Sequence, residues 1–361
     1  MECKAGSLGI RLEGASGPAA CITDVPGVEV GVATVPGEGT SQAGVTVILP
    51  RGRGGAAGDP VFAGTACLNG NGELTASHFL ADFGTLHGPI GLTSTHGVGL
   101  VRDHLAQWMR ARGGPDVLEW YIPCVAETWD GWLNDIDGEY VQKSHVDEAL
   151  ANASSAPVPN GNVGGGAGMM LYEFKGGTGT ASRLVPDSPY TVGVLVQANY
   201  GRREQLVVAG VPVGQLIGGD KVPLVWKRDQ GSIIVTIATD APLLPHQLNV
   251  VARHAAHGIA RVGGVSGIYS GDIAIAFSTA NCGVYAKAKA SETGSSSCEF
   301  ANDKLLNKIF SATAYATEEA ILNALLAAKD VVGQKDRHVY QLPHKLLAEC
   351  FESYRPPKLH V

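Results

Sequence analysis

Short runs of β-branched residues alternate with segments of helical periodicity along the chain, and this alternation is what most constrains its fold. Runs that predict buried strands lie at Val28–Val35, Val45–Leu49, Val192–Val196, Ser232–Thr239 and Ile273–Phe277. Helical patterns lie at Glu73–Leu86, Val98–Arg112, Pro245–Val262 and Thr317–Asp330. No repeat, long linker or shift of composition divides the 361 residues. We therefore expect a single α/β unit over residues 1–361.

The composition excludes several classes of protein. Charged residues make up 17% of the chain, its formal net charge is -7 and it has no run of Lys or Arg, so we expect no nucleic-acid partner. No apolar stretch reaches the roughly 18–20 residues that a membrane span requires, and the first residues lack the pattern of a signal peptide. The 48 glycines show no three-residue period, which excludes collagen.

The cysteines indicate a cytoplasmic protein. There are seven, they are scattered, and no two form a C-x-x-C pair. This pattern predicts reduced, mostly buried thiols, with neither a disulfide framework nor a zinc site. The loosest parts of the chain are expected at residues 149–168 and 288–297, which are rich in Gly, Ser and Ala.

Three motifs suggest a ligand but favour a simpler interpretation. Gly161–Gly168 could cradle a phosphate, yet it has no G-x-G-x-x-G register and no following G-K-[ST], so a tight turn with close backbone packing is preferred. His254 and His257 share a helix face but have no acidic or sulfur partner nearby, which favours a solvated face over a metal site. His96 could be a base, but a buried, hydrogen-bonded histidine is the preferred interpretation.

Gly231 and Ser232 carry a more specific hypothesis. They follow Asp229 and Gln230 in a polar turn that leads into the predicted strand Ser232–Thr239. A glycine without Cβ can adopt strained geometry and admits close attack on its carbonyl. If the Ser232 hydroxyl attacked that carbonyl, the chain would be cut and Ser232 would gain an α-amine of pKa about 7.7–8.0, able to act as general base for its own hydroxyl. The alternative interpretation is an ordinary turn.

The sequence resembles the DmpA-type aminopeptidases, which include β-aminopeptidases and L-aminopeptidase/D-esterases. The matching blocks follow one another in order at Ile22–Gly31, Gly44–Arg51, Pro60–Thr75, Glu127–Asp135, Gly161–Met169, Val196–Gly201, Gly231–Pro245 and Ser270–Asn281. The resemblance implies a four-layer αββα sandwich, like that of N-terminal-nucleophile hydrolases but with different connectivity. It also implies self-cleavage into an α piece, 1–231, and a β piece, 232–361. The pieces would assemble as a tetramer of heterodimers, and catalysis would need no metal or other cofactor.

The resemblance also assigns roles to individual residues. Ser232 matches the nucleophile, and Asn199 matches the asparagine whose side-chain amide helps to form the oxyanion hole. Ser270 and Asp272 match a serine and an acidic residue, Glu in some members, that support the nucleophile by hydrogen bonding. Without the resemblance, Asn199 could cap a turn, and Ser270 and Asp272 could belong to an ordinary turn before a strand.

Substrate recognition is implied at Glu127 and Trp129. Glu127 matches the acidic residue that holds the substrate's ammonium group, which would explain a requirement for a free amine. Trp129 departs from the tyrosine that the family usually has there, and its indole offers a differently placed N–H and more apolar bulk than a phenol does.

The sequence as a whole therefore predicts a self-processing serine aminopeptidase or amidase that acts on short peptides, amino-acid amides or esters, with β- or D-residues among the candidates. An acyl or aminoacyl transferase on the same scaffold is an alternative, since an amine could replace water in resolving an acyl-enzyme. A second alternative is a family member that does not process itself and only binds ligands. Transfer of the acyl group to an added amine would identify the transferase. A chain that stays uncleaved and inert would identify the binding protein.

Overall fold

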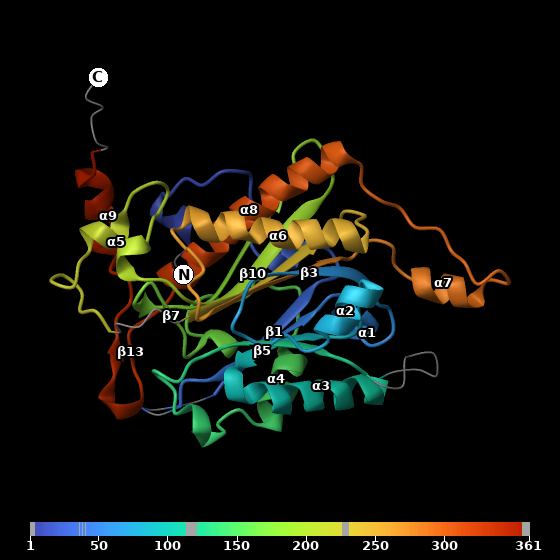
Figure 1. Cartoon of the computed structure of the whole chain (residues 1–361), viewed down its shortest axis with the longest axis horizontal. Coiled ribbons are helices and arrows are strands. Elements are labelled where there is room, and N and C mark those ends of the chain that lie inside the picture. Colours follow the sequence, from blue (N-terminus) through green and yellow to red (C-terminus); the bar gives the residue numbers. More distant parts are fainter. Residues whose placement is uncertain are drawn as a thin grey trace.

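Two β-sheets lie face to face between two layers of helices (Figure 1). The computed structural model describes residues 4–35, 37, 39, 41–112, 121–225 and 231–355. One sheet contains, in spatial order, β1 (Glu29–Thr34), β2 (Gly44–Leu49), β5 (Ile90–Ser94) and β6 (Cys124–Thr128). The other contains β4 (Thr85–Leu86), β3 (Val61–Gly70), β12 (Ser270–Ser278), β11 (Gly231–Thr239), β10 (Thr191–Asn199) and β9 (Gly177–Leu184).

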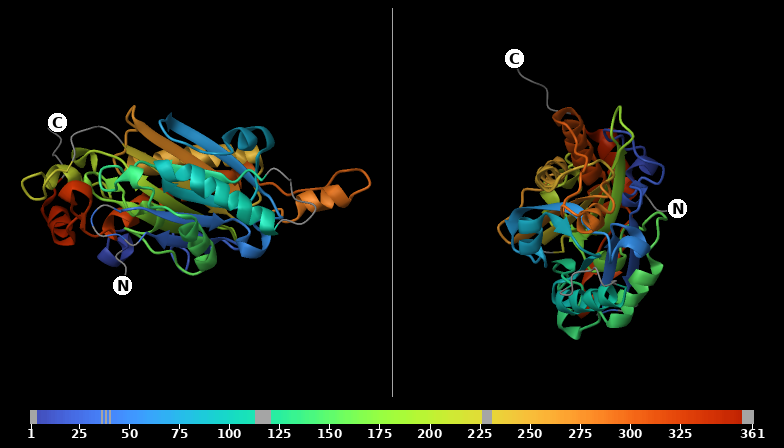
Figure 2. Two further views of the ribbon diagram at one scale, coloured as in Figure 1. Left: turned by 90° about the horizontal axis from the view of Figure 1, so that it is seen from below. Right: turned by 90° about the vertical axis from the view of Figure 1, so that its right-hand side faces the viewer.

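Helices cover the outer face of each sheet (Figure 2). The six-stranded sheet packs against α6 (Pro245–Arg261) and α8 (Asp303–Leu326), and the four-stranded sheet against α3 (Val98–Arg112) and α4 (Lys143–Asn152). The smaller elements are α1 (Gly52–Gly55), α2 (Ser77–Phe83), α5 (Val213–Leu216), α7 (Val284–Ala290), α9 (His344–Ser353) and the hairpins β7–β8 (Met170–Leu171, Phe174–Lys175) and β13–β14 (Val331–Val332, His338–Val339). The expected αββα sandwich is confirmed.

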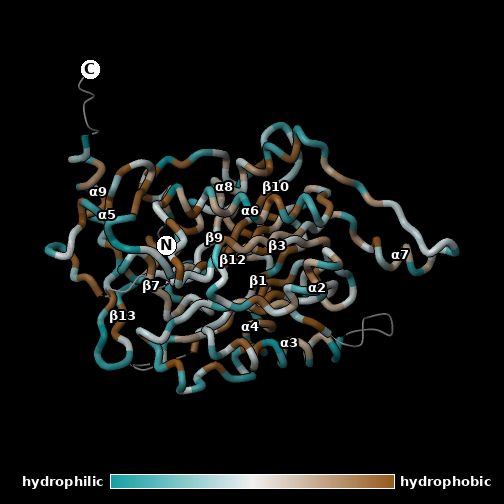
Figure 3. The backbone as a smooth tube through the Cα atoms, viewed as in Figure 1, coloured by the Kyte–Doolittle hydropathy of each residue, from teal (hydrophilic) through white to brown (hydrophobic). Residues whose placement is uncertain are grey.

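Apolar side chains fill each of the three interfaces between layers. Figure 3, coloured by residue hydropathy, shows hydrophobic residues along the central strands. Along β11 the alternation of a strand sends Ile233 and Val235 toward α6 and α8, and Ile234 toward the other sheet. Helix α6 buries Leu248, Val251, Ala252, Ala255 and Ile259, which recur at the spacing of one helix face. Hydrophobic burial on both faces of both sheets therefore accounts for the four layers.

Each sheet contains one parallel pair of strands joined by a covering helix. Strands β11 and β12 are parallel and connected through α6, and β5 and β6 are parallel and connected through α3. A helical crossover is the usual way to join parallel neighbours. Pro245 is the first residue of α6, where a missing N–H costs no hydrogen bond, as the sequence predicts.

Several predicted boundaries were wrong. The pattern at Glu73–Leu86 gives only the short helix α2, which ends at Gly84 in a left-handed conformation (φ 63°) before β4. Helix α8 begins at Asp303 rather than Thr317, capped by the Asn302 side chain, which accepts from Leu305 N at 3.0 Å. Residues 164–167 are buried between the sheets rather than loose.

The prediction of mostly buried cysteines was also wrong. Of the six described cysteines, all free, Cys21, Cys124 and Cys350 are buried, whereas Cys67, Cys282 and Cys298 are exposed. Cys282 and Cys298 flank α7 on an arm that extends away from the sandwich in Figure 1 and has no core in which to bury a thiol. Among the described residues, no helix is both long and apolar enough to cross a membrane.

Candidate active site

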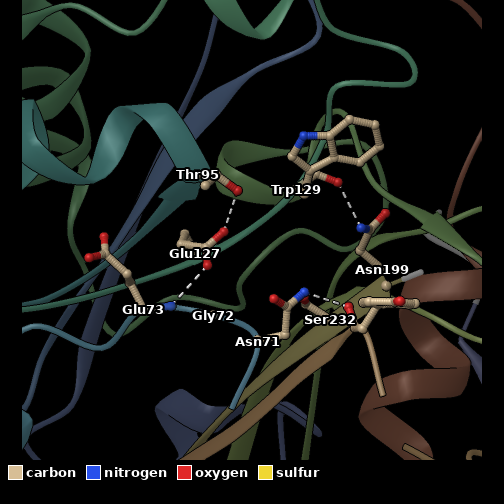
Figure 4. A pocket seen from close by; sticks show the side chains of 10 residues that line it. Asn71, Gly72, Glu73, Thr95, Glu127, Trp129, Asn199 and Ser232 are labelled. Atoms are coloured by element: carbon tan, nitrogen blue, oxygen red, sulfur yellow. Dashed lines mark hydrogen bonds between the residues drawn. The ribbon is translucent and has the colours of Figure 1, made fainter. Parts of the chain in front are cut away.

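A pocket of about 540 Å³ lies between the two sheets at one end of the sandwich (Figure 4). The carboxyl ends of β3, β5, β6 and β10 meet there with the amino ends of β11 and β12, as the strand registers require. Its lining residues are Asn71, Gly72, Glu73, Thr95, Glu127, Trp129, Asn199, Gly231, Ser232 and Tyr269. Five predicted site residues are therefore brought together, although they lie far apart in the sequence.

Ser232 lies near the start of β11, with its side chain on the face that meets the other sheet. It is 5% exposed, and its Oγ accepts a hydrogen bond from Gly271 N at 3.1 Å. Gly271 is the direct partner of Ser232 on β12, and an added Cβ there would lie 2.4 Å from Asn71 O. The hydroxyl is thus held in a central strand between two hydrogen-bonded neighbours.

Asn199 is directly opposite Ser232 on β10. Directly opposed residues of antiparallel strands have Cβ atoms about 4.5–5.5 Å apart on one face of the sheet. The Asn199 Oδ1 atom accepts from Met170 N at 2.8 Å, and Nδ2 donates to Trp129 O at 2.8 Å. Because a backbone N–H can only donate, the Met170 contact fixes which end of the amide is nitrogen. Nδ2 carries a second hydrogen, and Asn199 and Ser232 line the same pocket.

Glu127 comes from the four-stranded sheet, on β6, and faces Ser232 across the pocket. It is 4% exposed, and its carboxylate accepts from Glu73 N at 3.0 Å and from the Thr95 hydroxyl. Burial raises the pKa of Glu127 above 4.5, while the hydrogen bonds from Thr95 and Glu73 oppose that rise. A buried carboxylate of this kind attracts a cationic group that replaces the lost water.

Trp129 forms an apolar wall of the pocket beside Asn199. Its indole is 36% exposed and packs over Gly131, where an added Cβ would lie 2.5 Å from the ring. The contact of Trp129 with Asn199 uses the backbone carbonyl, so the amide is anchored whichever side chain stands at this position.

Gly231 is required for packing rather than for an unusual backbone angle. A Cβ on Gly231 would lie 2.5 Å from Asn199 O and 2.6 Å from Tyr200 Cα, but its φ is not positive. The strained geometry expected at this residue is not seen, since Gly231 pairs with Ser270 of β12 within the sheet. The turn predicted at Asp229 and Gln230 lies outside the described residues.

Ser270 and Asp272 lie on the opposite face of the six-stranded sheet from the Ser232 hydroxyl. The Ser270 hydroxyl donates to Asp272 Oδ1 at 2.6 Å, and both residues are buried on the side covered by α6 and α8. Burial raises the pKa of Asp272, and hydrogen bonds from Ser270 and Ser266 oppose that rise. Ser270 pairs with Gly231 in the sheet and borders the same small recess. The pair thus flanks the Gly231–Ser232 peptide rather than the pocket.

Sequence reasoning missed the other five pocket residues, which are Asn71, Gly72, Glu73, Thr95 and Tyr269. The first three lie within the matching block Pro60–Thr75, and Thr95 precedes the histidine that attracted notice, so a signal was present for these four. Their roles depend on contacts across the two sheets, which no local pattern contains.

The other motifs have structural roles. Gly164–Gly166 forms a 3₁₀ turn, and a Cβ on Gly166 would lie 2.2 Å from Thr178 N, so close packing explains the glycines. His254 stacks on the Phe310 ring at 3.9 Å, and the neighbouring His257 is exposed. In the part of the chain that the structure describes, no group of three or more His, Cys, Asp or Glu side chains is placed to hold a metal ion.

His96 is not the buried histidine that the sequence favours. It lies in the 3₁₀ turn Thr95–Gly97, which precedes α3. The side chain is 55% exposed, with Nδ1 3.1 Å from the Asp137 carboxylate. The His96 side chain is therefore exposed and lies beside an acidic side chain, rather than being buried.

Comparisons with known proteins place the chain among aminopeptidases. Residues 20–339 match the model of peptidase family S58. The β-peptidyl aminopeptidase BapA of Sphingosinicella microcystinivorans is 44% identical over 98% of this chain and 92% of its own length.

Solved structures agree in fold. A β-aminopeptidase from a Burkholderia species superposes with a TM-score of 0.91 and 46% identity, over 98% of this chain and 100% of that one. The L-aminopeptidase D-Ala-esterase/amidase of Ochrobactrum anthropi, described as a prototype for the serine aminopeptidases and a new variant of the Ntn hydrolase fold, superposes with a TM-score of 0.86 and 43% identity. It covers 97% of this chain and 98% of its own. The chain therefore belongs to peptidase family S58, the DmpA-type family that its sequence resembles, and is an aminopeptidase.

Proposed function

We propose that the chain matures by cutting itself between Gly231 and Ser232. The Ser232 hydroxyl adds to the Gly231 carbonyl carbon, the C–N bond breaks, and the serine nitrogen leaves as an amine once it has gained a proton. Water then hydrolyses the resulting ester, which gives pieces 1–231 and 232–361. The observation that carries this proposal is the register of β10 and β11, which sets the buried Ser232 hydroxyl beside the Asn199 amide.

In the mature enzyme the same hydroxyl would attack the substrate. The new α-amine of Ser232 accepts the hydroxyl proton and later delivers it to the leaving amine, and water releases the acyl group. The second Nδ2 hydrogen of Asn199 stabilises the negative charge on the substrate oxygen, a contribution typically worth about 2.7–4 kcal/mol. Ser270 and Asp272 lie beside the cleaved peptide, where they can position the new amine. The proposed steps use only these groups and water, with no cofactor.

Glu127 and Trp129 would select the substrate. The buried Glu127 carboxylate receives the ammonium group of an N-terminal residue, and Trp129 gives an apolar surface to its side chain. We infer that short peptides and amino-acid amides are substrates. An N-terminal β-residue is the first to test, since two of the relatives are β-aminopeptidases.

Location and assembly are part of the proposal. Free thiols at all six described cysteines fit a cytoplasmic location. Assembly of cleaved pairs into a tetramer comes from the family resemblance, and light scattering on the cleaved protein tests it directly.

One preparation tests the central claim. Denaturing electrophoresis with intact-mass measurement is expected to show two pieces that meet at Gly231 and Ser232, and the purified protein is expected to hydrolyse p-nitroanilides of β-alanine or alanine. The Ser232→Ala variant should remain one chain and be inactive. The matched control is Ser278→Ala at the far end of β12, a buried serine that donates to Ala241 O and should leave cleavage and activity intact. A wild-type chain that stays whole and inert would refute the proposal.

A further inference from the structure

A fully buried lysine lies behind the pocket and has no part in the proposed chemistry. Lys175, at the end of β8, is 0% exposed. Its Nζ donates to Met169 O and to Gly176 O, both at 2.8 Å. Burial lowers the pKa of this amine to about 7, and the charge of Asp130 opposes the shift. Burying an ammonium group is costly, so its position calls for an explanation.

The first link from Lys175 leads to the oxygen end of the Asn199 amide. The Met169 carbonyl that Lys175 binds belongs to the same peptide unit as the Met170 N–H, and that N–H donates to Asn199 Oδ1 at 2.8 Å. Gly176 N also donates to Met169 O at 2.9 Å. Lys175 therefore fixes the plane of the peptide that determines the orientation of Asn199.

The second link leads to the nitrogen end of the same amide. Asp130 follows Trp129, whose carbonyl accepts from Asn199 Nδ2. The Asp130 carboxylate is 1% exposed, and its Oδ1 has no hydrogen-bond partner among the described residues. Burial raises the pKa of Asp130 to about 7, and the positive charge of Lys175 opposes that rise. Lys175 therefore holds the contact at the oxygen end by hydrogen bonds, and at the nitrogen end it adds only a charge interaction with the neighbouring Asp130.

We propose that Lys175 is a positioning residue for Asn199, holding the Met169–Met170 peptide so that the Nδ2 hydrogen stays directed at the substrate oxygen. This inference rests on the proposed function, because it assumes that Asn199 stabilises the oxyanion. A lysine that served only the stability of the hairpin would make no difference to the chemical step in protein that remains folded.

A double-mutant cycle separates the two roles. The variants are Lys175→Met, which keeps the length and apolar stem of the side chain, Asn199→Ala, and the double variant. For each, kcat and KM are measured on β-alanine p-nitroanilide, with kcat calculated per cleaved active site. Variants that cleave too slowly are compared by the rate of cleavage at Gly231. The matched control is Arg183→Met, which removes another buried cation whose partners, Glu319 and Glu13 O, lie away from the pocket.

The proposal predicts a specific pattern. Lys175→Met should lower kcat at least tenfold with KM changed by less than threefold, and the loss should not exceed that of Asn199→Ala, about 10²–10³-fold for an oxyanion donor. In the Asn199→Ala background, Lys175→Met should lower kcat by less than a further threefold, since the effects of residues that act through one group are not additive. Arg183→Met should lower the melting temperature and leave kcat unchanged.

Two kinds of result would overturn the inference. Additive losses, or a kcat unchanged in Lys175→Met while Asn199→Ala is impaired, would show that the lysine serves stability alone. A wild-type kcat in Asn199→Ala would refute the oxyanion role of Asn199 and the inference with it. The Ser232→Ala test of self-cleavage is independent of both results, so a failure of the proposed function is distinguishable.

Discussion

Replacing Glu127 by glutamine tests how the pocket selects a free amine. The substitution keeps the shape of the side chain and removes its charge. Glu73 N–H can still donate to the amide oxygen, and the Thr95 hydroxyl can rotate to accept from the new NH₂ group, so the buried hydrogen bonds survive. The change therefore isolates the charge that would meet the substrate's ammonium group.

The expected loss follows from the burial of this carboxylate. A hydrogen bond to a charged group contributes about 1.5–3 kcal/mol, and each 1.4 kcal/mol is a factor of ten. With Glu127 only 4% exposed, solvent screens the interaction little, and kcat/KM for β-alanine p-nitroanilide should fall about 10- to 150-fold.

The control is a substrate without the amine. The p-nitrophenyl ester of propionic acid, which has no ammonium group, should react equally well with the wild type and the variant. The ratio of kcat/KM for β-alanine p-nitroanilide to kcat/KM for this ester should therefore be lower in the variant than in the wild type. Equal losses with both substrates would show that Glu127 supports the pocket rather than the amine, and the assignment would be wrong.

Three further predictions concern the same pocket. Because burial raises the pKa of Glu127, KM for an amine substrate should rise as the pH falls through that pKa and the carboxylate is neutralised. Thr95→Val removes a hydrogen bond that lowers this pKa, so in the variant the rise in KM should begin at a higher pH. A profile of KM against pH measures both effects. Trp129→Tyr should change KM for substrates with bulky apolar side chains but kcat less than about threefold, because the backbone carbonyl of Trp129 anchors Asn199. Gly231→Ala should slow self-cleavage at least tenfold by intact mass, because its Cβ would lie 2.5 Å from Asn199 O; normal cleavage would contradict the packing argument.

The strand that carries Ser232 could be predicted from local pattern alone, whereas its partners could not. The run at Ser232–Thr239 is β-branched and apolar, and it forms β11 nearly as expected. Asn199 faces Ser232 only because β10 and β11 pair in one register, and pairing is not a local property. Family resemblance supplied Asn199 and Glu127, and local reasoning would have left both as turn or strand residues.

Helix α8 shows why a correct rule can give a wrong boundary. Acidic residues favour the first turn of a helix, so Glu318 and Glu319 suggested a start at Thr317. In the structure both lie inside the helix and are buried, where they pair with Arg261 and Arg183. Their charge is satisfied by tertiary ion pairs, and a local rule cannot distinguish such residues from those that interact with a helix terminus.

The two sheets divide the work of the proposed enzyme, and this division bears on substrate choice. Ser232 and Asn199 belong to the six-stranded sheet, whereas Glu127 and Trp129 lie at the end of β6 in the other. The distance between the Ser232 hydroxyl and the Glu127 carboxylate is therefore a distance between sheets. A β-amino acid carries one more backbone carbon between amine and carbonyl than an α-amino acid does, a bond of about 1.5 Å.

We therefore expect the separation of the sheets near the pocket to decide which backbone length places its carbonyl at Ser232. Gln197, two residues before Asn199, spans that interface, and its Nε2 donates to Thr93 O and to Thr128 Oγ1, both at 2.8 Å. Thr128 is the neighbour of Glu127, so the Gln197 amide links β10, which carries Asn199, to β6, which carries Glu127. Gln197→Leu, which removes both bonds, should change the ratio of kcat/KM for β-alanine and alanine p-nitroanilides. An unchanged ratio in a folded, cleaved variant would show that the sheet separation does not select the backbone length.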